Sequence, residues 1–583
     1  MKAKTVALAV ILCAAGCLSG CLTPDDNANK LFVEASQLAR EAQEVEKISY
    51  ARALSLYQQA QVKLRMIPAS YPSSQMAVKL VEGQLRIRSY TITEFEDIII
   101  NQVRQKAEAE GKPLLCALLV SETIADPGAK AKVLIDIARA YAALSLQEQS
   151  SRILFRALAA ANSIQDASYR AGTLSDISGL FAQAGYYDQA LQIANAIDVM
   201  SDKANALIAV AAIYAKNGQT DKSAELLFRG LVIASTIKDP SFKAGVLTEI
   251  ARKYAELDRY EPALQVTRII DAPAERAMAL AAVGAGAASI GQKERASETL
   301  SKAFVTANTV KDPHARSKVL AELARKYADV DRFDQALLVA KIIEDVPVQV
   351  DVLADIAGKL NAAGQKQKSA EILSQTLTVV ASVSDPARKI SLLCLLGARC
   401  AENGQMEKAA EAVSQAHAVS TIVDDPVLKS ESLAQIAAAY LSLEDDEKAA
   451  PILSQAATRA RGIKDAYTKV KALQAVVRIY IRLGIPDKAA EAAAHAFLVA
   501  NAIGDPSCRV SVLMDISQQA AELGMTAVLQ DICTEALLAA QSMKDASYKT
   551  VALVEIGSRY PLPGRHLNDK SSKILHDIIL GLE

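Results

Sequence analysis

Few residues of this chain have the types and spacing that chemistry requires, and its cysteines come first. Five of them lie beyond the N-terminal segment: Cys116, Cys394, Cys400, Cys508 and Cys533. Their spacing matches neither a zinc motif nor a redox motif, and a free cysteine is commonly a small buried apolar residue. Because five thiols cannot all pair within one chain, the sequence leaves open whether Cys508 and Cys533 form a disulfide.

The histidines and the glycine-rich segment do not define a catalytic or metal site either. The five histidines are scattered along the chain: His314, His417, His495, His566 and His576. The sequence contains no His-Glu-x-x-His and no Gly-x-Ser-x-Gly, and segment 283–291 lacks the Gly-Lys-Ser/Thr ending of a phosphate loop. We therefore expect no catalytic residues, no bound metal and no cofactor, and a protein that is not an enzyme.

What does recur along the chain is one leucine, at intervals of either 33 or 40 residues. It stands at positions Leu134, Leu174, Leu207, Leu247, Leu280, Leu320, Leu353, Leu393, Leu433, Leu473, Leu513 and Leu553. A fixed period of this size indicates stacked copies of one supersecondary unit.

Each copy has the pattern of a helix, a turn and a second helix. An apolar residue three positions after the leucine, a small residue after four and often an aromatic after seven share one face of an α-helix. Eight positions before the leucine stands Asp in ten copies, six times followed by Pro, which marks a helix start. Eleven positions after it stands Gly in seven copies, where a left-handed residue can end the helix.

Two of these copies resemble the tetratricopeptide repeat. Residues 181–190 (Phe-Ala-Gln-Ala-Gly-Tyr-Tyr-Asp-Gln-Ala) and 214–223 (Tyr-Ala-Lys-Asn-Gly-Gln-Thr-Asp-Lys-Ser) carry the residues of that family at its spacing. The resemblance covers residues 126–560 and implies an all-α fold. The expected architecture is a right-handed α-solenoid of about twelve helix-turn-helix repeats of 33 or 40 residues.

The two repeat lengths predict an uneven outer surface. Seven extra residues correspond to about two helical turns, and adding them to the second helix keeps its apolar stripe in phase. Short and long repeats alternate between residues 166 and 384. We therefore expect a ridge of alternating height along the second helices of this part.

Four arginines are candidate binding residues on the first helices. Five positions after the leucine, a position that faces the concave groove in proteins similar to this family, stand Arg139, Arg252, Arg325 and Arg478. Arginine binds carboxylates with two parallel hydrogen bonds, which favours an acidic peptide segment or a C-terminus as the ligand. The alternative is that these arginines are solvated charges of a helix face.

The N-terminus has the pattern of an export signal. Lys2 and Lys4 precede an apolar run over residues 5–18, which is too short to span a membrane. Residues 18–21 (Leu-Ser-Gly-Cys) resemble a bacterial lipobox, which implies a signal peptide at 1–20 and a diacylated, palmitate-bearing Cys21. Residues 14–17 (Ala-Ala-Gly-Cys) are a weaker match, and an ordinary cleaved signal peptide is the alternative. By resemblance to enterobacterial lipoproteins, Leu22 after the cysteine favours the outer membrane, facing the periplasm.

The remaining sequence predicts how the chain is divided. Residues 23–29 are polar, and residues 21–29 are expected to be a lipidated tether. Residues 30–125 are expected to be a helical region of degenerate repeats, residues 126–560 the array, and residues 561–583 a capping helix. The formal net charge of −1 argues against nucleic-acid binding, which needs a marked positive excess.

These features together predict a membrane-anchored scaffold or adaptor in the bacterial envelope that binds unidentified protein partners. One alternative is a binder or processing factor for an envelope polymer, peptidoglycan or polysaccharide. The absence of Trp, with only 4% aromatic residues, counts against that alternative. A regulator that sequesters its partner is a further alternative.

Overall fold

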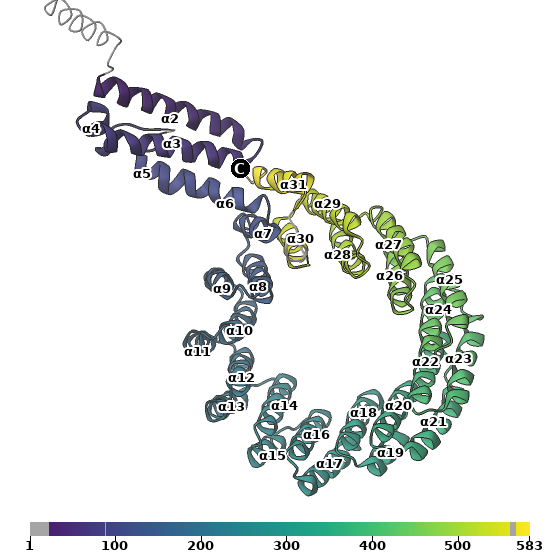
Figure 1. The fold of residues 1–583 in the computed structure, drawn as a ribbon. Helices are drawn as coiled ribbons and strands as arrows, with labels where there is room; N and C mark the ends of the chain where they lie inside the picture. Colours follow the sequence, from purple (N-terminus) through teal and green to yellow (C-terminus); the bar gives the residue numbers. More distant parts are fainter. Residues whose placement is uncertain (1–22, 88, 560–566, 583) are drawn as a thin grey trace, which may run out of the picture. The chain divides into compact units, whose positions relative to one another are not determined.

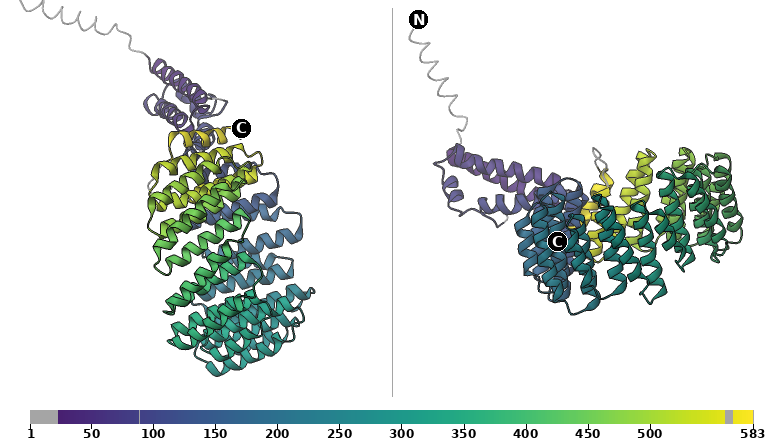
Figure 2. Two further views of the ribbon diagram at one scale, coloured as in Figure 1. Left: turned by 90° about the vertical axis from the view of Figure 1, so that its right-hand side faces the viewer. Right: turned by 90° about the horizontal axis from the view of Figure 1, so that it is seen from below.

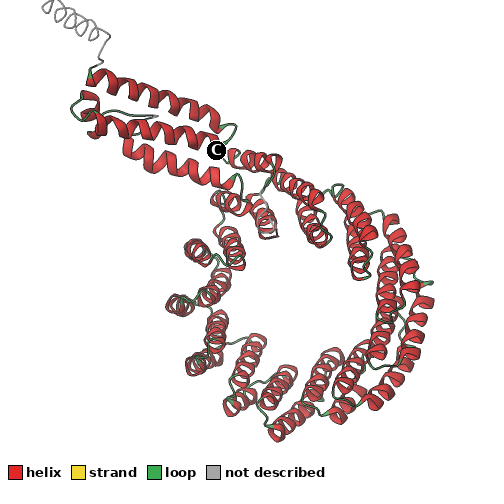
Figure 3. Cartoon of the chain, in the orientation of Figure 1, coloured by secondary structure: helices red, strands yellow, loops and turns green. Residues whose placement is uncertain are grey.

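The computed structural model describes residues 23–87, 89–559 and 567–582, and every regular element in these ranges is a helix (Figure 3). The predicted signal peptide and the predicted lipidation site, Cys21, lie outside the described residues. The chain forms two compact units. The terminal unit contains the residues up to Thr123 and those from Leu537 onward, and the repeat array contains Ile124–Ala536.

The first helix of every repeat holds one of the periodic leucines. In the repeat array these helices are α8 (Pro127–Ala143), α10 (Ala167–Gln183), α12 (Met200–Lys216), α14 (Pro240–Glu256), α16 (Pro273–Ser289), α18 (Pro313–Asp329), α20 (Val346–Ala362), α22 (Pro386–Glu402), α24 (Pro426–Leu441), α26 (Ala466–Arg482) and α28 (Pro506–Glu522). All twelve periodic leucines, including Leu553 in the terminal unit, are buried. The predicted helical solenoid of 33- and 40-residue repeats is therefore confirmed.

The predicted helix starts are also confirmed. Asp312 is the N-cap of α18, with Pro313 following, and one of its carboxylate oxygens accepts a hydrogen bond from the backbone N–H of Ala315 at 2.7 Å. The carboxylate satisfies a donor that the helix itself leaves without a partner.

The second helices account for the two repeat lengths. They are α9 (Gln147–Asn162), α11 (Tyr187–Ala196), α13 (Thr220–Ser235), α15 (Tyr260–Arg268), α17 (Lys293–Ala307), α19 (Phe333–Lys341), α21 (Lys366–Val380), α23 (Met406–Ser420), α25 (Asp446–Gly462), α27 (Pro486–Ala500) and α29 (Thr526–Ser542). Helices α11, α15 and α19 have only 9 or 10 residues, whereas α9, α13, α17 and α21 have 15 or 16. The two additional turns lie in the second helix, as expected from the spacing.

Within the repeat array the two kinds of helix form two layers. Consecutive first helices pack against one another and lie on the inner side of the curve in Figure 1, with the second helices outside them. Figure 2 shows the helices stacked side by side. The small residue after the leucine permits the close approach: a Cβ on Gly397 would lie 2.7 Å from Cγ2 of Val413 in the second helix. Where that residue is Ser178, its hydroxyl donates to the carbonyl of Ala190 at 2.8 Å.

The turn between the two helices needs a left-handed residue even where the sequence has no glycine. Gly218 and Gly404 have φ values of 76° and 79°. Ser145, Asp258, Asp331 and Glu444 occupy the same position in other repeats, with φ between 56° and 61°. An L-residue with a side chain is strained in this region by about 1–2 kcal/mol.

The terminal unit is built from both ends of the described chain. Its N-terminal part contains α2 (Pro24–Glu46), α3 (Tyr50–Ser70), α4 (Gln75–Val81), a continuous run of α5 (Ile92–Glu94), the π-helix η1 (Phe95–Ile100) and α6 (Asn101–Ala109), and then α7 (Pro113–Glu122). Its C-terminal part contains the end of α29, α30 (Ala546–Arg559) and α31 (Asp569–Leu580). Helix α7 packs on α30, and α31 packs on α6 and α7.

This composition corrects the predicted division of the chain. The sequence pattern places separate caps at 30–125 and 561–583, whereas the structure combines both segments and helix α30 in one unit. The physical reason is the apolar sequence of α7 (Pro-Leu-Leu-Cys-Ala-Leu-Leu-Val), which needs cover on several sides. Gly557 of α30 provides close cover, because a Cβ there would lie 2.6 Å from Cγ of Leu114.

The predicted tether is also corrected. Helix α2 begins at Pro24, so residues 24–29 form its first turns. Thr23 and Asp26 form a capping box, in which the Thr23 hydroxyl accepts from the Asp26 N–H at 3.1 Å and the Asp26 carboxylate accepts from the Thr23 N–H at 3.0 Å. Polar residues at 23–29 thus start a helix rather than form a linker.

A buried carboxylate joins the two ends of the chain within the terminal unit. Glu110 accepts hydrogen bonds from the backbone N–H of Tyr50 at 2.5 Å and of Ala51 at 3.1 Å, at the start of α3. Its Oε1 also lies 2.8 Å from Nδ1 of His576 in α31. Glu110 and His576 are only 8% and 2% exposed. The Glu110 side chain therefore caps α3 and also contacts α31, a helix that is distant in sequence.

Replacing a left-handed non-glycine residue should stabilise its repeat. In Glu444→Gly, the strain at φ 56° is removed, partly offset by the larger entropy of glycine in the unfolded chain, so we expect a gain of about 0.5–1 kcal/mol. Native-state hydrogen exchange of α24 and α25 measures it. Gly404→Ala is the matched control, because its Cβ would meet no atom within 4 Å yet should destabilise its own repeat. A loss of stability in Glu444→Gly contradicts the argument.

Removing the shared carboxylate should loosen both α3 and α31. Glu110→Ala leaves two backbone donors and the His576 ring buried without their acceptor, and we expect a cost of about 3 kcal/mol to the terminal unit. Hydrogen exchange of α31 should accelerate together with that of the first turn of α3. Glu108→Ala, an exposed change two residues away, is the control, and unchanged exchange in α31 would show that the contact with His576 is not stabilising.

Candidate binding face of the repeat array

The four predicted arginines all lie on first helices of the repeat array, and three of them are engaged by carboxylates. Arg139 lies 3.4 Å from Asp136 and 4.0 Å from Asp176. Arg325 donates to Asp355 at 2.9 Å. Arg252 pairs with Glu249 and Glu256 of its own helix. Arg478 is exposed and has no ion pair within the described ranges of the chain.

The carboxylates follow the same repeat as the arginines. Most stand two positions after the periodic leucine: Asp136, Asp176, Glu249, Glu322, Asp355 and Asp515. Several connect neighbouring first helices, as in the pair of Lys471 with Asp515 at 2.7 Å. The inner face is therefore a ladder of mixed charge. A tabulation of acidic residues by repeat position would have revealed it.

This ladder changes where an acidic ligand could bind. A paired arginine binds a ligand carboxylate only by exchanging one partner for another, and exposed pairs of this kind contribute little energy in either case. The acidic-ligand interpretation stays a prediction, and it applies best to a cleft whose lining contains cations and no carboxylate.

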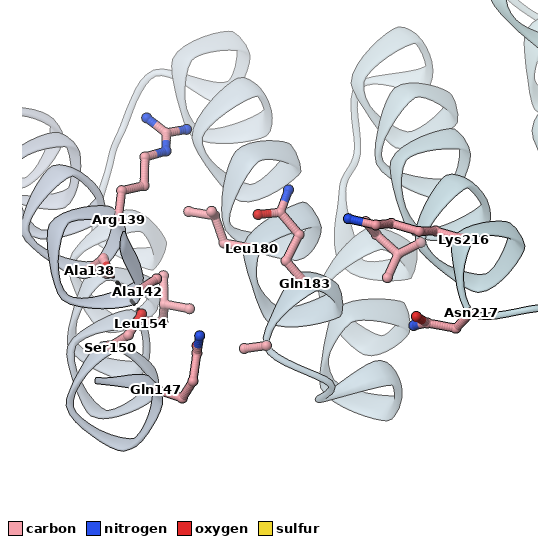
Figure 4. A pocket seen from close by; sticks show the side chains of 12 residues that line it. Ala138, Arg139, Ala142, Gln147, Ser150, Leu154, Leu180, Gln183, Lys216 and Asn217 are labelled. Carbon is pink, nitrogen blue, oxygen red and sulfur yellow. Dashed lines mark hydrogen bonds between the residues drawn. The ribbon is translucent and has the colours of Figure 1, made fainter. Parts of the chain in front are cut away.

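Such a place exists between the first three repeats of the array. A cleft of about 540 Å³ is lined by residues of α8, α9, α10, α12 and the turns that follow α10 and α12. Its lining residues are Ala138, Arg139, Ala142, Gln147, Ser150, Leu154, Leu180, Gln183, Ala184, Ile213, Lys216 and Asn217. In Figure 4, Arg139 lies at one side, Lys216 and Asn217 at the other, and Leu180 and Gln183 between them.

The chemistry of this cleft, which we call the basic cleft, suits a peptide. Arg139 and Lys216 are its two charged groups, and no carboxylate lines it. The amides of Gln147, Gln183 and Asn217 supply donors and acceptors for a peptide backbone. Leu154, Leu180 and Ile213 add apolar surface.

A second cleft of about 800 Å³, the acidic cleft, meets the first at Arg139. It is lined by Lys132, Ile135, Asp136, Arg139, Asp166, Ser168, Tyr169, Gly172, Thr173, Ser175, Asp176, Asp202 and Asn205. Four carboxylates there face two cations. Burial raises the pKa of Asp136 from its ordinary value, against the opposing effect of Arg139 and Lys132. Two clefts of opposite charge thus lie side by side on the first helices.

The cysteines do not form a reactive site in the described residues. All five are free thiols, so Cys508 and Cys533 are not bridged. Burial raises the pKa of Cys116, Cys394 and Cys533 to about 12 and that of Cys400 to about 11. Cys508 is exposed, and its hydrogen bond to Asp505 raises its pKa.

Two further searches of the described residues had negative results. No group of three or more His, Cys, Asp or Glu side chains there is arranged to hold a metal ion. Among the same residues, no helix combines the length and the apolar composition needed to cross a membrane.

Comparisons with known proteins give similarity to helical repeats only. No family model matches the chain, and no curated protein matches it. Solved structures do. A protein from Thermococcus onnurineus NA1 is 18% identical, covering 59% of this chain and 99% of its own, with a TM-score of 0.26.

Two other structures are similar over part of this chain. The TPR-like repeats of a putative kinesin light chain from Podosopora anserina are 18% identical, covering 39% of this chain and 100% of their own, with a TM-score of 0.23. A signal transduction ATPase with a tetratricopeptide repeat sensor from Pyrococcus horikoshii is 16% identical, covering 63% and 54%, with a TM-score of 0.22. The fold assignment therefore rests on the helix-turn-helix repeats of this chain itself.

The exposed and the buried cysteines should react with an alkylating reagent at very different rates. Among the cysteines of the described residues, only Cys508 should react with iodoacetamide in the folded protein, slowly near neutral pH and faster as pH rises, because the thiolate is the nucleophile. Asp505→Asn keeps the N-cap but removes the carboxylate that raises the Cys508 pKa, so the reaction at pH 8 should accelerate. Peptide mass spectrometry locates the label. Modification of Cys116 or Cys533 without denaturant would contradict their burial.

Proposed function

We propose that this protein is a non-catalytic scaffold that binds protein partners on the inner face of its repeat array. The observation that carries the proposal is the pair of oppositely charged clefts that meet at Arg139. Stacked repeats provide extended binding surfaces of this kind.

An extended peptide segment of the partner is the ligand that suits both clefts. An acidic side chain would enter the basic cleft between Arg139 and Lys216, and a basic side chain would enter the acidic cleft beside Asp176 and Asp202. The two clefts adjoin, so residues close together in one extended strand, which rises about 3.3 Å per residue, could reach both. Recognition of two opposite charges in a fixed order also gives selectivity against uniformly charged segments.

Membrane attachment in a bacterial envelope is the second part of the proposal. It is supported by the lipobox-like residues 18–21 and by the apolar run that precedes them. Acyl groups on Cys21 would hold the protein at the membrane, and more than one chain gives stable anchoring. Leu22 favours the outer membrane, with the array in the periplasm.

Reversing the charge of the basic cleft should abolish capture of partners. The full-length protein, extracted from membranes, is used for affinity capture and compared with Arg139→Glu plus Lys216→Glu. We expect at least a tenfold loss of capture, about 1.4 kcal/mol or more, for the partners that bind in the cleft. Loss at moderate salt should exceed loss at high salt, because salt screens exposed charges.

Arg152→Glu is the matched control, since Arg152 is an exposed residue of the outer helix α9 in the same repeat. Capture that survives the double reversal unchanged would overturn the assignment of this face. Recovery of an envelope polymer in place of proteins would favour the polymer-binding alternative.

A further inference from the structure

A capped helix starts two residues after the proposed lipid site. Thr23 is the N-cap of α2, and its hydroxyl also donates to Asp26 at 2.7 Å. Only Leu22 separates it from Cys21. A fully extended chain spans at most about 3.6 Å per residue, so lipidation at Cys21 would hold the start of α2 within about 7 Å of the anchored cysteine.

Helix α4 is fastened to this same end of α2. The carboxylate of Asp25, in the first turn of α2, accepts a hydrogen bond from the N–H of Gln75, the first residue of α4, at 2.7 Å. Helix α4 also packs on α2 and on α3. Any surface that meets the start of α2 is therefore close to α4.

The outward side of α4 carries two valines that its packing leaves exposed. Ala77 and Leu80 are buried against the unit, at 2% exposure each. Val78 and Val81 remain 48% and 74% exposed, three positions apart on one helix face. Gln75, Lys79 and the C-cap residue Glu82 are exposed as well, so polar groups flank the valines. A short helix with exposed valines and a lysine is suited to the interface of a membrane, where apolar side chains enter and a lysine stays at the headgroups.

We propose that α4 is a membrane-contacting helix whose Val78 and Val81 insert into the lipid interface beside the acyl anchor. This proposal rests on the proposed lipidation of Cys21. The lipid surface then covers the two valines, because the chain between the anchored Cys21 and α2 is too short to hold α4 far from the membrane. The α2–α3 pair is rigidly attached to that contact, with Ile48 at its opposite end, about 35 Å away at 1.5 Å per residue for the 23 residues of α2.

The contact can be measured in vesicles of phosphatidylethanolamine and phosphatidylglycerol that contain the full-length lipoprotein. In a Cys508→Ser background the other described cysteines are buried, so a fluorophore can be placed at Val81→Cys or, as the control, at Ile48→Cys, a residue that is 66% exposed. A quencher is carried on lipid acyl chains just below the headgroups. We expect quenching to be several-fold stronger at position 81 than at position 48.

A second pair of variants tests the valine face directly. Val78→Glu should reduce quenching of the label at position 81, because a carboxylate resists entry into the interface, whereas Val33→Glu, at an exposed site in the body of α2 (62% exposed), should not. Equal quenching at positions 48 and 81, or none at 81, overturns the proposal.

The intact mass of the same sample distinguishes a failure of the proposed role of α4 from a failure of the proposed lipidation. An acylated N-terminus without quenching at position 81 overturns the role of α4 and leaves the anchor. A mass without acyl groups, the state that Cys21→Ser would enforce, overturns the anchor and the role of α4 together. Partner capture through the basic cleft is independent of both outcomes.

Discussion

The structure depends on one constraint: no repeat can bury the apolar stripe of its own first helix. The periodic leucine and the small residue four positions later lie between a first helix, its own second helix and the next first helix, as Gly397 against Val413 shows. The two helices of a repeat can approach closely only if small residues lie between them. The neighbouring repeat buries the rest of the apolar stripe. Stability is therefore shared along the array, and the ends of the stack need special cover. In the terminal unit, α7 and α30 supply it to each other.

The same packing decides which side chains are free to bind. The leucine stripe turns one side of each first helix inward to the core, which leaves the positions two and five residues after the leucine on the inner face. Arginines and carboxylates at those positions pair across repeats, as Arg325 does with Asp355. Such pairs align neighbouring helices and also occupy the charges. Under the proposed function, partners would bind where this pairing is weak, at the cleft of Arg139 and Lys216, rather than at every repeat.

The terminal unit holds segments from both ends of the described chain together and gives its first helix a capped start. Glu110 caps α3 and contacts His576, so residues from both ends of the described chain share a buried polar centre. The capping box at Thr23 gives the first helix a fixed start. The capping box satisfies backbone donors of the first turn, and under the proposed lipidation of Cys21 this helix start would lie close to the lipid.

The sequence by itself determined the local features: helix starts at Asp-Pro, left-handed turns, and a second helix that differs by two turns between repeats. These follow from interactions between residues close in the chain, which leave a periodic signal. Even the turns at Ser145 and Glu444 could be inferred from their place in the period. Only the tertiary structure decided that Arg139 and Arg325 pair across repeats, because Asp176 and Asp355 lie on neighbouring helices. It alone joined Leu114 to Gly557 and Glu110 to His576, since such distant contacts depend on shape and leave no mark in one sequence.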